Sequence, residues 1–287
     1  MRWTIRHRTA YRYAMPVRDS FNEARVRPPT DTQQRLEEFR LTVAPAARVS
    51  HFVDFYGNAV AYFDVCDPHS ALDMEVRSVV TTLPRQWLPW DARSSPLADA
   101  RRAGQTERFD FSRASRFVDT DPETWRLAVD ATQGQTDIWQ AAVAIMRFVH
   151  DRMAYEPAST HVHTHARDAL SKRRGVCQDF AHIMIGLCRS LHIPARYVSG
   201  YLATQGASAT HAWTDVFIPT VGWVSVDPTH NRQPDETYIR LAAGRDYSDV
   251  PPLRGTYRGT NQHRMDVLVE IKSDNGSSSS FSASTAQ

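Results

Sequence analysis

The chain of 287 residues has only three cysteines, only two lysines and no long apolar run. Three cysteines without a framework spacing argue against a disulfide-stabilised fold. The absence of about 18 consecutive apolar residues argues against a membrane-spanning helix. The first 15 residues alternate charged and apolar side chains and lack the apolar centre of a secretory signal. We therefore expect a cytoplasmic protein with reduced thiols.

An excess of one charge is also missing. The 34 basic and 32 acidic residues leave a formal net charge of +2, which is too small to indicate a nucleic-acid or membrane partner. Almost all of the basic residues are arginines, and their even spread indicates a compositional bias rather than a binding stripe. The apolar content of 41% is ordinary for a globular protein, and the length favours two domains.

Residues 1–85 have the pattern of short β-strands. Apolar and polar residues alternate through the first nine positions, and similar patterns recur at 39–43, 60–65 and 74–81. Proline, glycine and asparagine residues typical of turns separate these segments. Strands at this spacing predict an antiparallel β-sandwich at the N-terminus.

The next part of the chain predicts helices. Residues 86–135 are rich in proline and polar side chains and are predicted to connect two domains, with a short helix near 117–126. From Thr136 onward, apolar residues recur at three- and four-residue spacing, which predicts a longer helix. A second helix is expected at 166–171 and a third from about Cys177 to Leu191.

The last part predicts strands and a tail. Strand-like runs follow at 195–202, 211–218, 223–226 and 265–271. Residues 136–272 are therefore expected to form a core in which a helix packs on an antiparallel sheet. The serine-rich end, 273–287, is predicted to be disordered. We predict an α+β protein, with the N-terminal β-sandwich ahead of this core.

Cys177 lies at the start of a predicted helix, directly after Gly175 and Val176. The unpaired N–H groups of a first turn and the positive end of the helix dipole favour a thiolate, which is the nucleophilic form. Cys188 lies further along the same helix among apolar residues, and Cys66 lies in the β-rich region. Both are expected to be inert, so Cys177 is the predicted nucleophile.

His211 and Asp227 lie on the two strands of a predicted hairpin. Its turn at 219–222 places His211 opposite residues 227–230, where paired residues are about 5 Å apart. Asp215 is the rival carboxylate, but it lies four residues along the same strand, at roughly 13 Å. Cys177, His211 and Asp227 therefore form a predicted nucleophile, base and orienting carboxylate for thiol-based acyl transfer.

Several other residues carry weaker hypotheses. His161, His163 and His165 alternate and could ligate zinc, but no cysteine or carboxylate with matching spacing follows. We interpret them as a polar loop at the rim of the cleft, and predict no metal and no cofactor. Asp179 is expected to favour the helix dipole from the first turn, and His182 to have a packing or supporting role.

Four segments in order resemble the bacterial form of the transglutaminase-like superfamily, namely 175–181, 193–201, 211–213 and 223–229. Two N-terminal stretches, 22–28 and 54–58, resemble the β-rich domain that precedes the core in bacterial members. The resemblance implies a papain-like core with Cys177 as nucleophile, His211 as base and Asp227 as orienter. These are the three residues that the local patterns indicate. The short separation of Cys177 and His211 is unlike that of papain itself.

The resemblance also suggests residues around the reaction centre. Tyr155 lies where similar proteins often place an aromatic side chain before the nucleophile. The oxyanion hole is expected to use the Cys177 backbone N–H and one further donor, and Gln178 and Trp213 are candidates for the oxyanion hole or the cleft. For Trp213, core packing is an equally good interpretation, and for Trp223 core packing is preferred.

The expected function is acyl transfer on amide bonds of a protein or peptide substrate, through a thioester on Cys177. Hydrolysis is preferred over cross-linking, because water needs no second binding site and an intracellular cross-linker would endanger its host. The alternatives are transamidation of protein glutamine, cleavage of glycan–asparagine amides, and a non-catalytic protein-interaction module. No pattern indicates an oligomeric state.

Overall fold

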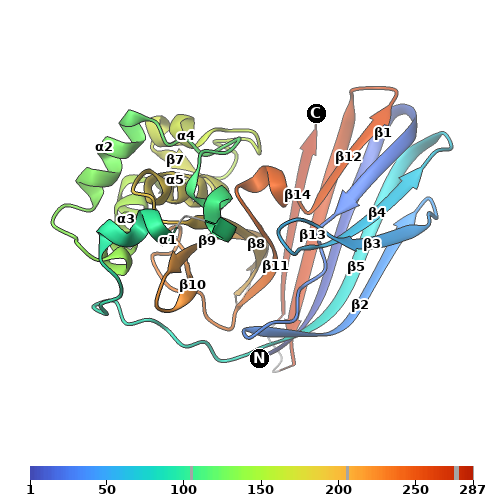
Figure 1. The fold of residues 1–287 in the computed structure, drawn as a ribbon. Coiled ribbons are helices and arrows are strands. Elements are labelled where there is room, and N and C mark those ends of the chain that lie inside the picture. Colours follow the sequence, from blue (N-terminus) through green and yellow to red (C-terminus); the bar gives the residue numbers. More distant parts are fainter. Residues whose placement is uncertain (104–105, 205–206, 275–277, 287) are drawn as a thin grey trace.

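A computed structural model describes residues 1–286 apart from 104–105, 205–206 and 275–277. The chain forms two packed halves, a curled β-sheet and a mixed core of helices and strands (Figure 1). This confirms the predicted α+β class. In the described part of the chain, no helix combines the length and the apolar character needed to cross a membrane.

The long strand β1 (Arg2–Ala24) runs through both parts of the N-terminal sheet. Its first part pairs with β5 (His69–Thr82) and β13 (His263–Ser273). Its second part pairs with β4 (Ala59–Val65) and β12 (Leu253–Arg258). The pairing register shifts in the middle of β1, and such irregularities bend a strand and increase its twist. One strand therefore serves both parts of a single curled sheet.

Three further strands complete the eight-stranded antiparallel sheet. They are β2 (Gln34–Ala44) beside β5, β3 (Val49–Val53) beside β4, and β14 (Ser278–Ala286) beside β13. Buried and exposed residues alternate along β1, β4 and β5, as one-sided burial of a pleated strand requires. Phe63 and Met74 are buried in the apolar cluster that joins the two parts.

Two expectations about the C-terminal part of the chain do not hold. Residues 253–272 were expected in the core, but β12 and β13 pair with the N-terminal sheet. The segment 273–287 was expected to be disordered, but Ser278–Ala286 form β14, which pairs with Arg264–Lys272 of β13; residues 275–277 and 287 lie outside the described residues. Backbone hydrogen bonds require no apolar side chains, so a serine-rich segment can cover the otherwise open edge of β13.

The core is built on a second antiparallel sheet with the strand order β10-β9-β8-β11. These strands are β8 (Ala195–Thr204), β9 (Ala207–Ile218), β10 (Gly222–Val226) and β11 (Tyr238–Gly244). The helix α5 (Cys177–Ser190) packs against β8 and β9, and every residue from Gln178 to Ser190 is buried. Because α5 is enclosed along its length, its first residue is held in a fixed position.

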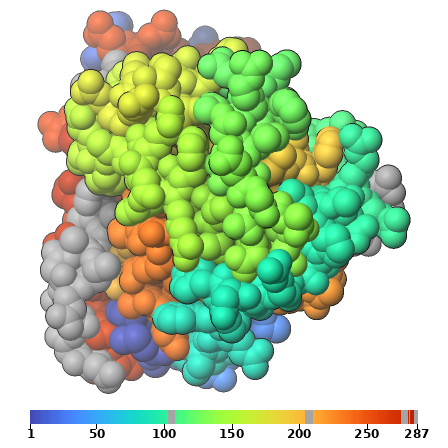
Figure 2. All heavy atoms as spheres, turned by 90° about the vertical axis from the view of Figure 1, so that its left-hand side faces the viewer, coloured from blue at the N-terminus to red at the C-terminus, as the bar shows by residue number. Residues whose placement is uncertain are grey.

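Other helices surround α5 (Figure 1). The helices are α2 (Pro122–Ala131), α3 (Ile138–Arg152) and α4 (Ala166–Lys172), and the helical side of the molecule, which they cover, faces the viewer in Figure 2. Before them lie η1 (Leu97–Asp99), α1 (Ala100–Ala103) and η2 (Thr106–Ser112), and η3 (Tyr247–Asp249) follows β11. Asp121 and Asp137 cap α2 and α3 by accepting backbone N–H bonds.

The other face of the core sheet packs on the N-terminal sheet. Trp3, Tyr201 and Ile271 belong to the apolar cluster between them. Two buried amides add paired hydrogen bonds to the backbone of β11, Gln34 to Arg240 and Asn58 to Ala243. The core sheet is thus enclosed by helices on one side and by the N-terminal sheet on the other.

Gly200 marks the closest approach within the core sheet. A Cβ atom at this position would overlap the Ile239 carbonyl oxygen and lie 2.6 Å from the Trp213 ring. We expect Gly200→Ala to lower the free energy of unfolding by about 3 kcal/mol, because backbone and a buried ring cannot both move away. Chemical denaturation measures this, with Ser199→Ala as the control on the same strand. An equal effect of the two substitutions would contradict the explanation.

Candidate active site

Cys177 is the first residue of α5, and its position is fixed by the segment before it. The short strand β7 (Arg174–Gly175) pairs in parallel with β6 (Ala154–Tyr155). The Asp179 carboxylate accepts hydrogen bonds from the Val176 N–H at 2.8 Å and from a threonine hydroxyl of the preceding loop, that of Thr160. This closes the turn that presents the half-buried thiol.

Glycine is required at position 175 by the same turn. A Cβ atom there would lie 2.6 Å from a carboxylate oxygen of Asp179. Burial raises the pKa of Asp179, although the hydrogen bonds from Thr160 and Val176 act in the other direction. The predicted first-turn position of Asp179 is therefore correct, and its carboxylate also ties α5 to the loop that contains Thr160.

The hairpin of β9 and β10 brings His211 and Asp227 together. The two strands are in register from Ile218 and Gly222 to Thr214 and Val226. Asp227 directly follows β10, and its Oδ2 lies 2.8 Å from His211 Nε2. Both side chains are buried. With Nε2 directed at Asp227, Nδ1 is the imidazole nitrogen left for Cys177.

The electrostatics of His211 link the three residues. Burial alone would lower the pKa of His211, but the charge of Asp227, the hydrogen bond to it, and the hydrogen bond and charge of Cys177 raise the pKa to about 10. The structure thus joins the thiol, the imidazole and the carboxylate in one chain of contacts, in the order that the sequence predicted.

Asp227 has more partners than the sequence indicated. Its Oδ2 accepts hydrogen bonds from His211, from His230 Nδ1 at 2.8 Å and from the Tyr238 hydroxyl at 2.7 Å. Its Oδ1 accepts the Thr229 N–H at 2.8 Å. Burial opposes ionisation, but the charge of His211 and these hydrogen bonds hold the pKa of Asp227 well below its usual range.

Contacts of His230 and Tyr238 with Asp227 were not predicted from the sequence. His230 had a local signal, because a histidine three residues after a turn aspartate can fold back onto it. Tyr238 had none, because it comes from β11 and reaches Asp227 only through the sheet. The Tyr238 ring also packs edge-on against His211, with ring centroids 5.7 Å apart. Both residues fix the carboxylate that orients the imidazole.

Asp227, His211 and His230 are also the one group in the described ranges whose ligand atoms lie close enough to hold a metal ion, within 4.8 Å of one another. Two imidazoles and a carboxylate suit zinc or iron. Both imidazole nitrogens, however, lie 2.8 Å from the same carboxylate oxygen. A metal would have to replace both hydrogen bonds. The alternating histidines at 161–165 form no such group among the described residues.

The rival carboxylate has other partners. Asp215 forms an ion pair with Arg196 at 2.8 Å and accepts a hydrogen bond from Ser225. Burial opposes ionisation, but the charge of Arg196 keeps the pKa of Asp215 below its ordinary value. Asp215 therefore binds side chains of the neighbouring strands β8 and β10 and not the His211 imidazole, as the strand spacing predicted.

The three residues predicted for the oxyanion hole or the cleft lie in different surroundings. Tyr155 is exposed, and partial burial together with an electrostatic interaction with Cys177 raises its pKa, so it lies near the thiol. The Gln178 amide donates one N–H to the Val162 carbonyl oxygen at 3.0 Å, which directs the side chain toward that loop. Trp213 is buried against Tyr238. Of the two interpretations left open for Trp213, this burial favours core packing.

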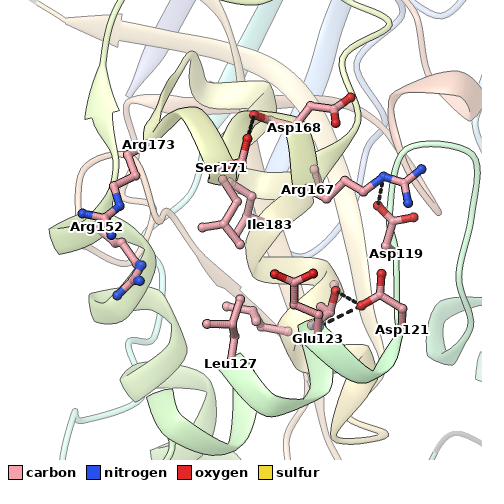
Figure 3. A pocket seen from close by; sticks show the side chains of 15 residues that line it. Asp119, Asp121, Glu123, Leu127, Arg152, Arg167, Asp168, Ser171, Arg173 and Ile183 are labelled. Carbon is pink, nitrogen blue, oxygen red and sulfur yellow. Dashed lines mark hydrogen bonds and ion pairs between the residues drawn. The ribbon is translucent and has the colours of Figure 1, made fainter.

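A cavity of about 390 Å³ lies away from the triad on the outer side of α5 (Figure 3). Its apolar floor includes Leu127 and Ile183. Asp119 and Asp121 lie at one side of it, opposite Arg152. Cys177, His211 and Asp227 do not line it. The candidate catalytic residues therefore lie at the start of α5 and not in this cavity.

Comparison with known proteins decides the family. Residues 3–81 match the bacterial transglutaminase-like N-terminal region, and residues 126–228 match the transglutaminase-like superfamily. The chain belongs to the transglutaminase-like superfamily. Both halves of the predicted resemblance are confirmed, and the match to the core ends just after Asp227.

One relative of this superfamily protein matches most of the chain and another matches less than half of it. An uncharacterized protein of Mycobacterium leprae is 36% identical over 281 residues, covering 94% of this chain and 98% of the relative. A protein-glutamine gamma-glutamyltransferase of Pseudomonas aeruginosa is 34% identical over 141 residues, covering 42% of this chain and 21% of that protein.

A solved structure shares the architecture. The crystal structure of a candidate cysteine protease from Cytophaga hutchinsonii aligns with a TM-score of 0.77 and 23% identity, covering 100% of this chain and 98% of that one. At this identity the likeness shows the fold alone. It includes both the curled N-terminal sheet and the transglutaminase-like core.

Proposed function

We propose that this protein is a cysteine-dependent enzyme that hydrolyses amide bonds of peptides or proteins. The observation that carries the proposal is the buried His211–Asp227 pair in contact with a thiol at the start of a buried helix. A nucleophile, a base and an orienting carboxylate with this geometry are the parts that thioester chemistry requires.

In the first half-reaction, His211 takes the thiol proton and the Cys177 sulfur attacks the amide carbon. The first intrahelical bond of α5 is donated by Asp179, so the N–H groups of Cys177 and Gln178 are available to the oxyanion. The imidazolium then protonates the amide nitrogen, the carbon–nitrogen bond breaks, and an amine leaves. The acyl group remains on Cys177 as a thioester.

In the second half-reaction, His211 removes a proton from water as its oxygen attacks the thioester carbon. The carbon–sulfur bond breaks, the sulfur recovers the proton, and a carboxylic acid leaves. A primary amine in place of water would give transamidation. Transamidation is supported by the relative from Pseudomonas aeruginosa, a protein-glutamine gamma-glutamyltransferase that matches part of this chain.

The test measures hydrolysis and transamidation in the same reaction. Wild-type protein and Cys177→Ala are incubated with glutamine-containing peptides and a fluorescent primary amine. We expect release of ammonia or new peptide ends to exceed amine incorporation, and both to require Cys177. Incorporation that outruns hydrolysis would make the protein a cross-linker. Absence of any Cys177-dependent turnover would favour a non-catalytic interaction module.

A further inference from the structure

A second cavity, of about 300 Å³, lies where the N-terminal sheet meets the core. Strands β1, β12 and β13 form one wall, and the segments around Phe117, His163 and Tyr247 form the other. Ligand sites occur preferentially at such boundaries between domains, and this volume is at the lower end of their usual range. Seven side chains with aromatic or imidazole rings line it, namely Tyr11, Tyr13, Phe117, His163, Tyr247, Tyr257 and His263.

The rings on the sheet side form a contiguous surface. Tyr13 and Tyr257 have ring centroids 4.9 Å apart, and the Tyr11 and His263 rings are 5.4 Å apart. The Tyr257 hydroxyl lies 2.9 Å from His263 Nδ1, which fixes both rings. Tyr11, Tyr257 and His263 are only half-buried. Large rings left partly open at a cavity provide contact area for another ring at little entropic cost.

The charge around this cavity has one sign. Arg116 and Arg254 lie at its edges, and no carboxylate lines it among the described residues. Arg254 is paired with Glu23 at 3.2 Å. The Arg116 guanidinium lies 5.3 Å from the Phe117 ring centre and has no ion pair with any described acidic residue. A ring that carries or adjoins a negative charge fits these surroundings best.

The cavity is tied to the region of Cys177 by direct contacts. Val162 lines it, and the Val162 carbonyl oxygen accepts the hydrogen bond from Gln178, the residue after Cys177. The Phe117 ring stacks on His182, which lies five residues beyond Cys177 on α5. At 1.5 Å per residue, that separation along the helix is about 7.5 Å. With the 5.7 Å between the His182 and Phe117 rings, the contacts from Cys177 to the cavity wall extend over roughly 13 Å, which an extended peptide spans in about four residues.

We propose that this cavity binds an aromatic side chain with a neighbouring carboxylate in the peptide substrate, about three or four residues from the amide that Cys177 attacks. The inference rests on the proposed function and deepens it by naming the substrate class. The N-terminal domain then supplies part of the substrate site, through Tyr11, Tyr257 and His263.

The test uses matched glutamine peptides that differ in one dipeptide, Tyr-Glu or Ala-Ser, placed three or four residues before or after the reacting glutamine. For the better position, we expect wild-type kcat/KM to favour the Tyr-Glu peptide by about tenfold. In Arg116→Glu the preference should vanish, because the new carboxylate repels the peptide. Arg126→Glu, an exposed substitution on α2 outside the cavity, should keep the preference.

A second measurement is independent of turnover. Binding of the same fluorescent peptides to Cys177→Ala is followed by anisotropy, with and without Arg116→Glu. Equal affinities for the Tyr-Glu and Ala-Ser peptides at every position would overturn the inference. If no peptide is cleaved but the Tyr-Glu peptide binds better and loses this advantage in Arg116→Glu, the proposed hydrolysis fails while the peptide site stands.

Discussion

Cys177→Ala is expected to lower kcat by at least about 10⁴-fold, because no other group in the site can hold the acyl intermediate. The half-buried side chain sits at the start of an enclosed helix, so its truncation to alanine should leave the fold intact. Steady-state kinetics on a cleaved peptide and a thermal melt measure the two effects. Retained activity in a folded variant would remove Cys177 from the mechanism.

Cys188→Ala is the matched control on the same helix. Cys188 is fully buried, and burial raises the pKa of its thiol to about 12, so it is inert toward electrophiles. Iodoacetamide at near-neutral pH should therefore label Cys177 and spare Cys188. Labelling of Cys177 no faster than that of an unactivated peptide thiol would contradict its activation by His211 and the helix start.

Asp227→Asn is expected to lower kcat by about 10⁴-fold while the protein remains folded. Asparagine can keep a hydrogen bond to His211, but it removes the buried negative charge that stabilises the imidazolium. Asp215→Asn is the control, since Asp215 contacts Arg196 and not the imidazole. A comparable loss of kcat in folded Asp215→Asn would show that the orienting carboxylate has been misassigned.

The pH dependence of kcat/KM follows from the negative charge of Asp227. The pKa of His211 is raised to about 10, so the imidazolium that protonates the leaving amine persists until pH rises through about 10. We expect the alkaline limb of kcat/KM in the wild type there. In Asp227→Asn the pKa of His211 should fall toward its ordinary value, about 6.5, which NMR titration of the imidazole measures. An unchanged pKa would contradict the role of Asp227.

The triad could be predicted because its signals are local. A turn at 219–222 sets the hairpin register, which runs to Thr214 and Val226 and so brings Asp227, the next residue, close to His211. The helix start at Cys177 is equally local, since the residues that form it lie within a few positions. The wider environment of Asp227 could not be predicted, because Tyr238 reaches it from a strand at the other edge of the sheet.

The assignment of the C-terminal strands to the core was wrong for a related reason. Pairing of β13 with β1 joins the two ends of the chain, and no local pattern indicates which sheet a strand will join. Serine-rich β14 had no apolar alternation to reveal it, because its pairing uses the backbone. Trp213 was ambiguous because an aromatic residue on a strand suits a core or a cleft, and burial alone separates the two.

The return of β12 and β13 to β1 sets the order in which this protein can be completed on the ribosome. β1 emerges from the ribosome long before two of its partner strands. Trp3 pairs with Ser273 on β13, and Phe21 pairs with Thr256 on β12, so these pairs form only after the core has been synthesised. Throughout synthesis of the core, the nascent N-terminal sheet carries open strand edges, which are templates for aggregation. Nascent chains that end before Leu253 should therefore depend on chaperones, because β12 and β13 have not yet been synthesised.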